Sequence, residues 1–268
     1  MQHSRPVRYA ILIIAAYFCV QFINHLLHRQ LEPTKNMTTS SPRPKSEFPS
    51  GVGRKFTSDG AVLPFPGNTI VSHLSPTAPL YKSLLDLYAK LEASHLSSLF
   101  TLLPPSSWHM TVFEGVCDQV RRPTHWPRDL PLDASLEKCT SYFTGKLKDF
   151  LLGEDNPPYK LRIEGISELK IGIGIHLEFV SSEEEGRLRR LRDRLADVLE
   201  LRHPQHEVYE LHFSMAYLLR DLDDGQKQEL TALLLDHLEQ APKEFELGAP
   251  EFCTFENMFH FERQFYLK

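Results

Sequence analysis

Apolar residues recur in two alternating periods along residues 55–268, and this alternation constrains the fold more than any other feature of the chain. Spacings of three or four residues are typical of amphipathic helices and predict helices over 76–94, 132–152, 182–201 and 223–240. Spacings of two are typical of half-buried strands and predict strands over 69–74, 100–103, 106–113, 159–166, 170–180, 211–218, 252–255 and 259–267. Helices interspersed with strands in this order indicate an α+β fold of two lobes.

Residues 1–28 are predicted to form an N-terminal membrane anchor. The mostly apolar run over 9–27 is just long enough to span a bilayer as a helix. A cleaved signal peptide is the alternative, but no small-residue cleavage site follows the run. Basic residues on its two sides favour a single-pass membrane protein with a cytosolic C-terminal domain, because Arg29, Lys35, Arg43 and Lys45 outnumber Arg5 and Arg8.

Residues 29–52 are predicted to be a flexible linker, and residues 53–268 the folded domain. Thr, Ser and Pro dominate the linker, which has no apolar periodicity. Residues 56–268 are acidic, with 22 basic and 33 acidic side chains. This balance argues against a groove that follows a long nucleic acid, since such affinity comes mostly from lysine and arginine. A short substrate with one or two phosphates remains compatible with it.

The cysteines show no close pairing and no C-x-x-C motif. Cys19 falls in the apolar N-terminal run, which leaves Cys117, Cys139 and Cys253 for the folded domain. This pattern predicts neither a disulfide framework nor a zinc site, and it favours a reducing compartment. The sequence also lacks H-E-x-x-H, an Asp-rich calcium loop and the G-x-S-x-G elbow of serine hydrolases.

Two further patterns favour structural interpretations. The helix over 182–201 is predicted to begin with a capping box formed by Ser182 and Glu185. Its arginines invite a nucleic-acid interpretation, but they alternate with acidic residues and are predicted to form a solvated face: Arg187, Arg189, Arg190, Arg192 and Arg194. Gly172 and Gly174 lie inside an alternating strand without a third glycine, so they indicate a close-packed strand rather than a nucleotide-binding loop.

The pattern H-x-[ST] occurs four times, beginning at His73, His95, His109 and His212. His95 falls at the end of a helix, where the dipole favours histidine without a further role. His73 ends a strand just before Pro76, which indicates a cap or edge position. Only the copies at 109 and 212 lie inside uninterrupted β-prone runs. Because side chains alternate along a strand, His109 and Thr111 should project from one face, and so should His212 and Ser214.

The two motifs resemble the tandem His-x-Thr/Ser signature of the 2H phosphoesterase superfamily, which includes 2′-5′ RNA ligase-like proteins and cyclic nucleotide phosphodiesterases. The resemblance covers roughly residues 54–268 and extends to one functionally uncharacterised branch of the superfamily, through the segments 55–60, 64–69, 103–115 and 209–217. It implies two pseudo-symmetric lobes whose antiparallel sheets form a concave cleft, with helices on the outside. The second motif has serine where threonine is commoner, and the hydroxyl is retained.

The resemblance also implies a function and a set of site residues. His109, Thr111, His212 and Ser214 are the expected catalytic positions of a metal-independent phosphoesterase for cyclic (2′,3′-type) or 2′-5′ nucleotide phosphodiesters. No cofactor and no metal is expected, and the domain is expected to act as a monomer on a small nucleotide or a short RNA end. A nucleotide-binding module that uses the same cleft without turnover is the alternative. Which histidine serves as the base and which as the acid stays open at this point.

Overall fold

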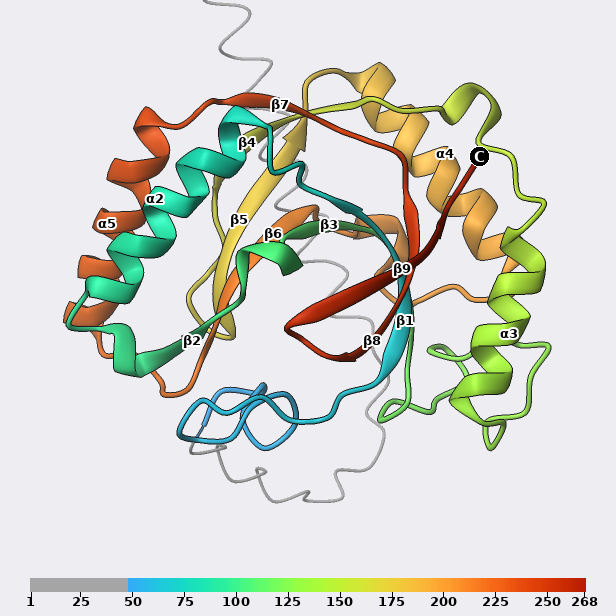
Figure 1. Ribbon diagram of the computed structural model, residues 1–268, viewed down its shortest axis with the longest axis horizontal. Coiled ribbons are helices and arrows are strands. Elements are labelled where there is room, and N and C mark those ends of the chain that lie inside the picture. Colours follow the sequence, from blue (N-terminus) through green and yellow to red (C-terminus); the bar gives the residue numbers. More distant parts are fainter. Residues whose placement is uncertain (1–47) are drawn as a thin grey trace, which may run out of the picture. The chain divides into compact units, whose positions relative to one another are not determined.

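A nine-stranded antiparallel sheet organises residues 48–268, the part of the chain that the computed structural model describes (Figure 1). Its strands run in the order β7-β4-β5-β6-β3-β1-β8-β9, and β2 also pairs with β6. The strands are β1 (Gly67–His73), β2 (Phe100–Leu102), β3 (His109–Cys117), β4 (Tyr159–Ile166), β5 (Gly172–Phe179), β6 (His212–Leu218), β7 (Glu244–Leu247), β8 (Glu251–Asn257) and β9 (His260–Tyr266). The helices are α2 (Pro79–Ala93), α3 (Leu136–Leu147), α4 (Ser182–Val198) and α5 (Asp224–Gln240), with short 3₁₀ turns η1 (Ser97–Leu99), η2 (Pro105–Ser107), η3 (Gly153–Asp155) and η4 (His206–Val208).

The sheet divides into two similar halves that meet between β3 and β6. In one half, β1 is followed by α2 and, after the short strand β2, by β3, and β1 pairs antiparallel with β3. In the other half, β5, α4 and β6 repeat this order with the same antiparallel pairing. Met110 in β3 pairs with Phe213 in β6 and joins the halves. The predicted α+β fold of two lobes is therefore confirmed.

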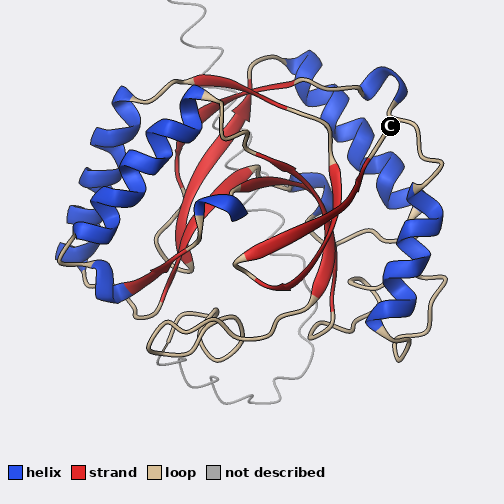
Figure 2. Ribbon diagram, viewed as in Figure 1, coloured by secondary structure: helices blue, strands red, loops and turns tan. Residues whose placement is uncertain are grey.

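The helices lie outside the curled sheet and cover it with apolar stripes (Figure 2). Helix α2 buries four leucines at helical spacing, and burial of each contributes about 1.5–3 kcal/mol: Leu80, Leu84, Leu87 and Leu91. Helix α5 lies beside α2 (Figure 1), where His237 Nε2 donates to the carbonyl oxygen of Ser83 at 2.8 Å. Helices α3 and α4 lie at the other side of the domain in the same view.

Local rules explain most element boundaries, with two corrections. Helix α4 is capped by Ser181, whose hydroxyl accepts from the backbone N–H of Glu184, so the capping box predicted at Ser182 and Glu185 is wrong and the N-cap lies one residue earlier. Strand β7 was not predicted, because its four residues are too few for a periodic signal. The glycines of β5 are close-packed as predicted: a Cβ on Gly172 would lie 2.2 Å from the carbonyl oxygen of Ala216.

The N-terminal predictions fall mostly outside the described residues. The predicted anchor over 1–28 and the linker up to residue 47 belong to that part of the chain. Residues 48–52, also assigned to the linker, are described and contact the domain: Val52 forms a β-bridge with Phe56, and Gly51 packs on the ring of Tyr217. Between residues 48 and 268, no helix has both the length and the apolarity needed to cross a bilayer.

Candidate active site

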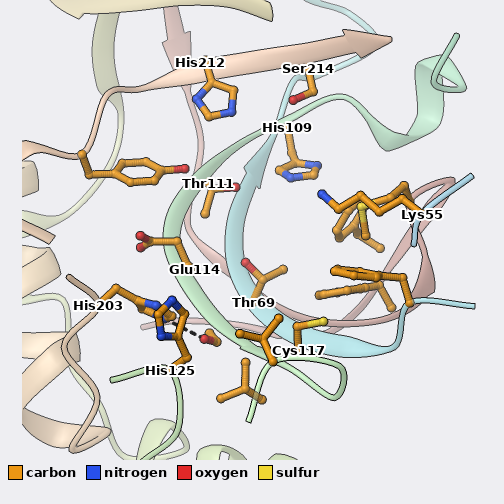
Figure 3. Close-up of a pocket in the computed structure, with 18 of the residues that line it drawn as sticks. Lys55, Thr69, His109, Thr111, Glu114, Cys117, His125, His203, His212 and Ser214 are labelled. Carbon is orange, nitrogen blue, oxygen red and sulfur yellow. Dashed lines mark hydrogen bonds between the residues drawn. The ribbon is translucent and has the colours of Figure 1, made fainter. Parts of the chain in front are cut away.

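The two histidine motifs lie on β3 and β6, the adjacent strands at the centre of the sheet. Met110 and Phe213 pair directly and are fully buried, so the residues on either side of them project from the opposite face. Continuing this antiparallel register by one residue places Thr111 opposite His212, and His109 opposite Ser214. Figure 3 shows the four side chains in this crossed arrangement, facing one cavity. Each histidine therefore lies across from the hydroxyl of the other motif.

Both histidine rings are oriented by the same backbone contact. Nδ1 of His109 lies 2.7 Å from the carbonyl oxygen of Ser107, and Nδ1 of His212 lies 3.0 Å from that of Glu210. A carbonyl oxygen can only accept, so Nδ1 carries the proton and donates in each ring. In the neutral rings the lone pair is therefore on Nε2. The two motifs share this contact with the residue two positions earlier, which extends the similarity of the two halves to the site itself.

The environment of His109 strongly favours the neutral ring. Burial lowers its pKa to about 3; nearby His73 and His212 act in the same direction, and the carbonyl of Ser107 opposes them. The ring of Phe261 packs edge-on against it, with 4.2 Å between ring centroids. A neutral imidazole with a lone pair is the form that a general base requires.

The stability of the domain should therefore depend on the protonation of His109. In the unfolded chain a histidine titrates near 6.5, whereas folded His109 stays neutral down to about 3. Between these pH values the unfolded state binds a proton that the folded state does not. The contribution of the neutral ring to the free energy of unfolding is therefore complete above about pH 6.5 and is lost as the pH falls. When the pH is lowered from 7 to 5, we expect the free energy of unfolding of wild type to fall by about 1–2 kcal/mol more than that of His109→Asn, as measured by urea unfolding. Parallel pH dependences in the two proteins would contradict the burial of a neutral ring.

The motif hydroxyls face the same cavity. Thr111 lines it together with Tyr209, which precedes β6. Burial raises the pKa of Tyr209 well above its ordinary value, so the phenol remains protonated. Ser214 is partly exposed and faces the cavity from β6 (Figure 3). The two hydroxyls lie where they can donate to an anion held between the histidines.

The cavity has a volume of about 590 Å³, which is large enough for a nucleotide-sized ligand. One part of its wall is aromatic and apolar, and another carries histidines and a carboxylate. The residues that line it besides the four motif side chains include Lys55, Phe65, Thr69, Glu114, Cys117, His125, His203, Tyr209, Tyr217, Phe255 and Phe261. We did not assign roles to Lys55, Glu114 or Tyr209 from sequence, although all three fall in the segments that carry the family resemblance.

The prediction that the arginines of α4 form a solvated face is wrong for Arg192. Its side chain is only 1% exposed. The guanidinium donates to the carbonyl oxygen of Val112 at 2.6 Å and to a carboxylate oxygen of Glu114 at 3.2 Å, and it stacks on Tyr209 at 4.2 Å from the ring centroid. Helical spacing could have revealed this, because position 192 is four residues after Leu188 and three before Leu195 on the buried stripe. Arg192 thus connects α4 to β3 and to the segment that precedes β6.

The other two H-x-S copies lie outside the cavity lining. His95 follows α2 and is exposed, 3.5 Å from a carboxylate oxygen of Glu229. His73 is the last residue of β1, an interior strand between β3 and β8, so the predicted edge position is wrong, whereas its place at a strand end is as predicted. Its Nδ1 lies 3.0 Å from Glu251, and its ring is 5.8 Å from that of His109.

Two groups of side chains within residues 48–268 lie close enough to share a metal ion. One is His73, Glu251 and Cys253, and the other is Asp193, His206 and Glu207. In the first, Arg263 already bonds to Glu251, and in the second, Arg202 bonds to both carboxylates. Neither group lines the cavity between the histidine motifs. Their carboxylates are therefore neutralised by protein cations.

Comparison with known proteins agrees with the fold and with the first motif. A family model described as a domain of unknown function (DUF1868) and labelled 2H-phosphodiest matches residues 55–172, a segment that contains His109 and Thr111 but ends before His212. This match supports a phosphodiesterase type of function. No curated protein shows significant sequence similarity to the chain.

Among solved structures, a conserved protein of unknown function from Agrobacterium tumefaciens strain C58 (ATU0111) is similar over 82% of this chain and 93% of its own, with 29% identity and a TM-score of 0.75. The Thermus thermophilus protein TT0787 has 12% identity over 70% of this chain and 87% of its own, with a TM-score of 0.42. Escherichia coli LigT in complex with ATP has 9% identity over 71% of this chain and 87% of its own, with a TM-score of 0.38. The last two likenesses are too distant to bear on function.

Proposed function

We propose that the domain is a metal-independent phosphoesterase that opens cyclic (2′,3′-type) or cleaves 2′-5′ nucleotide phosphodiesters by acid–base catalysis with His109 and His212. The observation that carries this proposal is the crossed pairing of two histidines and two hydroxyls across β3 and β6 in a single cavity. A phosphate between these strands would have a base or acid on each side and a hydroxyl donor next to each histidine.

The reaction needs one proton removed and one supplied. Nε2 of one histidine takes a proton from water, and the water oxygen attacks phosphorus. The bond from phosphorus to the leaving ribose oxygen breaks, and Nε2–H of the other histidine protonates that oxygen. Thr111 and Ser214 donate to the non-bridging oxygens, on which negative charge develops in the transition state. For a 2′,3′-cyclic phosphate, the release of ring strain lowers the barrier further.

His109 is the better candidate for the base. Desolvation keeps its ring neutral, whereas an acid must start protonated. A bound phosphate anion next to the ring raises its affinity for a proton, so that His109 can accept one in the complex. His212 then supplies the proton to the leaving oxygen. This assignment predicts that the acid limb of the kcat/KM profile extends well below pH 6. If the midpoint of this acid limb instead lies at the ordinary pKa of a histidine in both wild type and His212→Asn, the roles of base and acid would be reversed between the two histidines.

A substrate panel tests the function. Wild type would be assayed with 2′,3′-cyclic, 3′,5′-cyclic and 2′-5′-linked nucleotides, with and without EDTA, beside the His109→Ala/His212→Ala double variant. We expect turnover of at least one 2′,3′-cyclic or 2′-5′ substrate, unaffected by EDTA and absent in the double variant. Tight binding of nucleotide monophosphates without turnover would instead favour a nucleotide-binding module that uses the same cleft.

The position of the domain in the cell is a separate proposal. The apolar run over 9–27 and the basic residues after it support a single-pass anchor with the domain on the cytosolic side. Fractionation of cells that express the full chain would test it. Recovery in the aqueous fraction without detergent would overturn the anchor and leave the proposed chemistry untouched.

A further inference from the structure

The cavity between the histidine motifs has two ends of opposite charge. Figure 3 shows Lys55 on one side, with its ammonium directed towards the cavity beside His109, and Glu114 on the other side with its carboxylate towards the cavity. Lys55 is the only lysine or arginine that lines this cavity, and Glu114 is its only acidic residue, as far as residues 48–268 are concerned. A ligand bound across the histidine pair therefore meets a cation at one end and an anion at the other.

Lys55 is held in a fixed position by aromatic residues. Its Nζ donates to the hydroxyl of Tyr217 at 2.7 Å and lies over the rings of Tyr217 and Phe65, 4.6 and 5.1 Å from their centroids. The next residue, Phe56, is fully buried and packs on Tyr217, which fixes the loop. An ammonium has three N–H donors, and Tyr217 takes one. Two donors remain for a ligand, on a side chain that is already oriented.

The charge at this end is not neutralised by the protein. Within the described part of the chain, neither Lys55 nor its exposed neighbour Arg54 forms an ion pair with a carboxylate. Both cations act on the nearby thiol of Cys117: burial raises its pKa, and Lys55 and Arg54 oppose that rise. Residues 56–268 carry 33 acidic against 22 basic side chains, so carboxylates are abundant elsewhere. An unpaired lysine in the wall of the cavity of such a domain, with an unpaired arginine next to it in the chain, indicates a site for an anion.

The opposite end is built to accept hydrogen bonds and to repel anions. Glu114 is 23% exposed, and Arg192 holds it in place from beneath. His203 Nε2 donates to the carbonyl oxygen of Gly115 at 2.9 Å, and the ring of His125 packs edge-on against it. A carboxylate at this position suits hydroxyl or amine donors, such as those of a sugar or a nucleobase. A second phosphate placed there would face a like charge.

We propose that Lys55 binds a second anionic group of the substrate, a phosphate ester separate from the one between the histidines, and that the substrate lies with its neutral hydrogen-bond donors towards Glu114. This inference rests on the proposed phosphoesterase function and names the class of substrate: nucleotides with an additional phosphate. It also assigns the orientation in the cavity, because Lys55 and Glu114 would discriminate between the two directions.

A purely structural role for Lys55 predicts a different outcome. Its stem packs on Phe65 and Tyr217, so removal of the charge could affect only the stability of the loop. Lys55→Met keeps most of the stem and removes the ammonium, and Lys55→Arg keeps the charge. Lys227→Met, at an exposed position on α5 outside the cavity, is the matched control for loss of a lysine.

The experiment compares the affinities of a nucleoside 2′,5′-bisphosphate and the corresponding 2′-monophosphate by calorimetry. In wild type we expect the bisphosphate to bind about 10–100 times more tightly, as expected for hydrogen bonds to a charged group. In Lys55→Met the ratio of the bisphosphate affinity to the monophosphate affinity should fall to nearly one. Lys55→Arg should retain part of this preference, and Lys227→Met should leave it unchanged. The preference of wild type should also weaken with added salt.

Binding of these product-like ligands does not require turnover, so the two proposals can fail separately. If wild type shows no preference for the bisphosphate, or if Lys55→Met retains it, the inference about Lys55 is overturned even when cyclic phosphates are hydrolysed. If the preference depends on Lys55 but the substrate panel gives no turnover, the phosphate subsite stands and the phosphoesterase function does not.

Discussion

Replacement of His109 or His212 by alanine is expected to lower kcat/KM by about 10²–10⁴ each, the usual contribution of a positioned acid or base. Each variant removes one of the two proton transfers that the reaction needs. Because the histidines act in the same step, the double variant should be little worse than either single variant. The measurement is turnover of the best substrate from the panel, with circular dichroism and thermal unfolding to show that the fold is retained.

His176→Ala provides a matched control for these variants. His176 pairs directly with His212 across β5 and β6, yet it does not line the cavity. Its loss removes an imidazole from the same part of the sheet without removing either proton transfer, so activity should stay within about twofold of wild type. If His109→Ala or His212→Ala keeps near wild-type turnover, or if His176→Ala loses as much as they do, the proposed mechanism is wrong.

The hydroxyl positions should contribute less than the histidines. A donor to the non-bridging oxygens strengthens its bond as charge builds, and loss of such a donor typically costs about 10²–10³ in kcat. Thr111→Val and Ser214→Ala are therefore expected to lower kcat more than they raise KM.

Local patterns in the sequence were sufficient to predict most elements and the two motif strands. The alternation of apolar residues places Met110 and Phe213 in the core and the motif side chains on the other face, and the structure confirms this. That β3 lies next to β6 could not be derived from periodicity, because strand pairing depends on contacts between residues far apart in the chain. The family resemblance supplied this expectation, and the register shows the crossed arrangement.

Side chains whose roles depend on tertiary contacts could not be assigned from sequence. Lys55 belongs to a loop with turn chemistry, and its importance comes from Tyr217 and Phe65, which reach it from other parts of the chain. Glu114 lies in β3 just after the first motif, but only its contact with Arg192 shows that its carboxylate is held in place. Arg192 was misassigned because charge composition was given more weight than its position on the apolar stripe of α4.

Replacement of Arg192 by methionine is expected to destabilise the domain by about 2–4 kcal/mol. The variant would leave the carbonyl of Val112 without its donor and the partly buried carboxylate of Glu114 without its cation. Urea unfolding measures this loss. Addition of Glu114→Gln should recover part of it, because the uncompensated charge is then removed. Arg190→Met, on the same helix, should cost less than about 1 kcal/mol, since Arg190 is 57% exposed and its partner Asp155 keeps Arg194.

The effect of Arg192→Met on catalysis should exceed its effect on the amount of folded protein. Arg192 bonds to the backbone of β3 next to Thr111 and stacks on Tyr209, which lines the cavity together with Thr111. Its loss lets the two motif strands shift relative to each other, and a displacement of about 1 Å at reacting groups can lower the rate about 10²-fold. Measured where the variant is fully folded, kcat should fall about 10–100-fold with the pH profile of wild type, because no acid or base is removed. A variant that is destabilised but fully active would show that Arg192 supports the core without positioning the motifs.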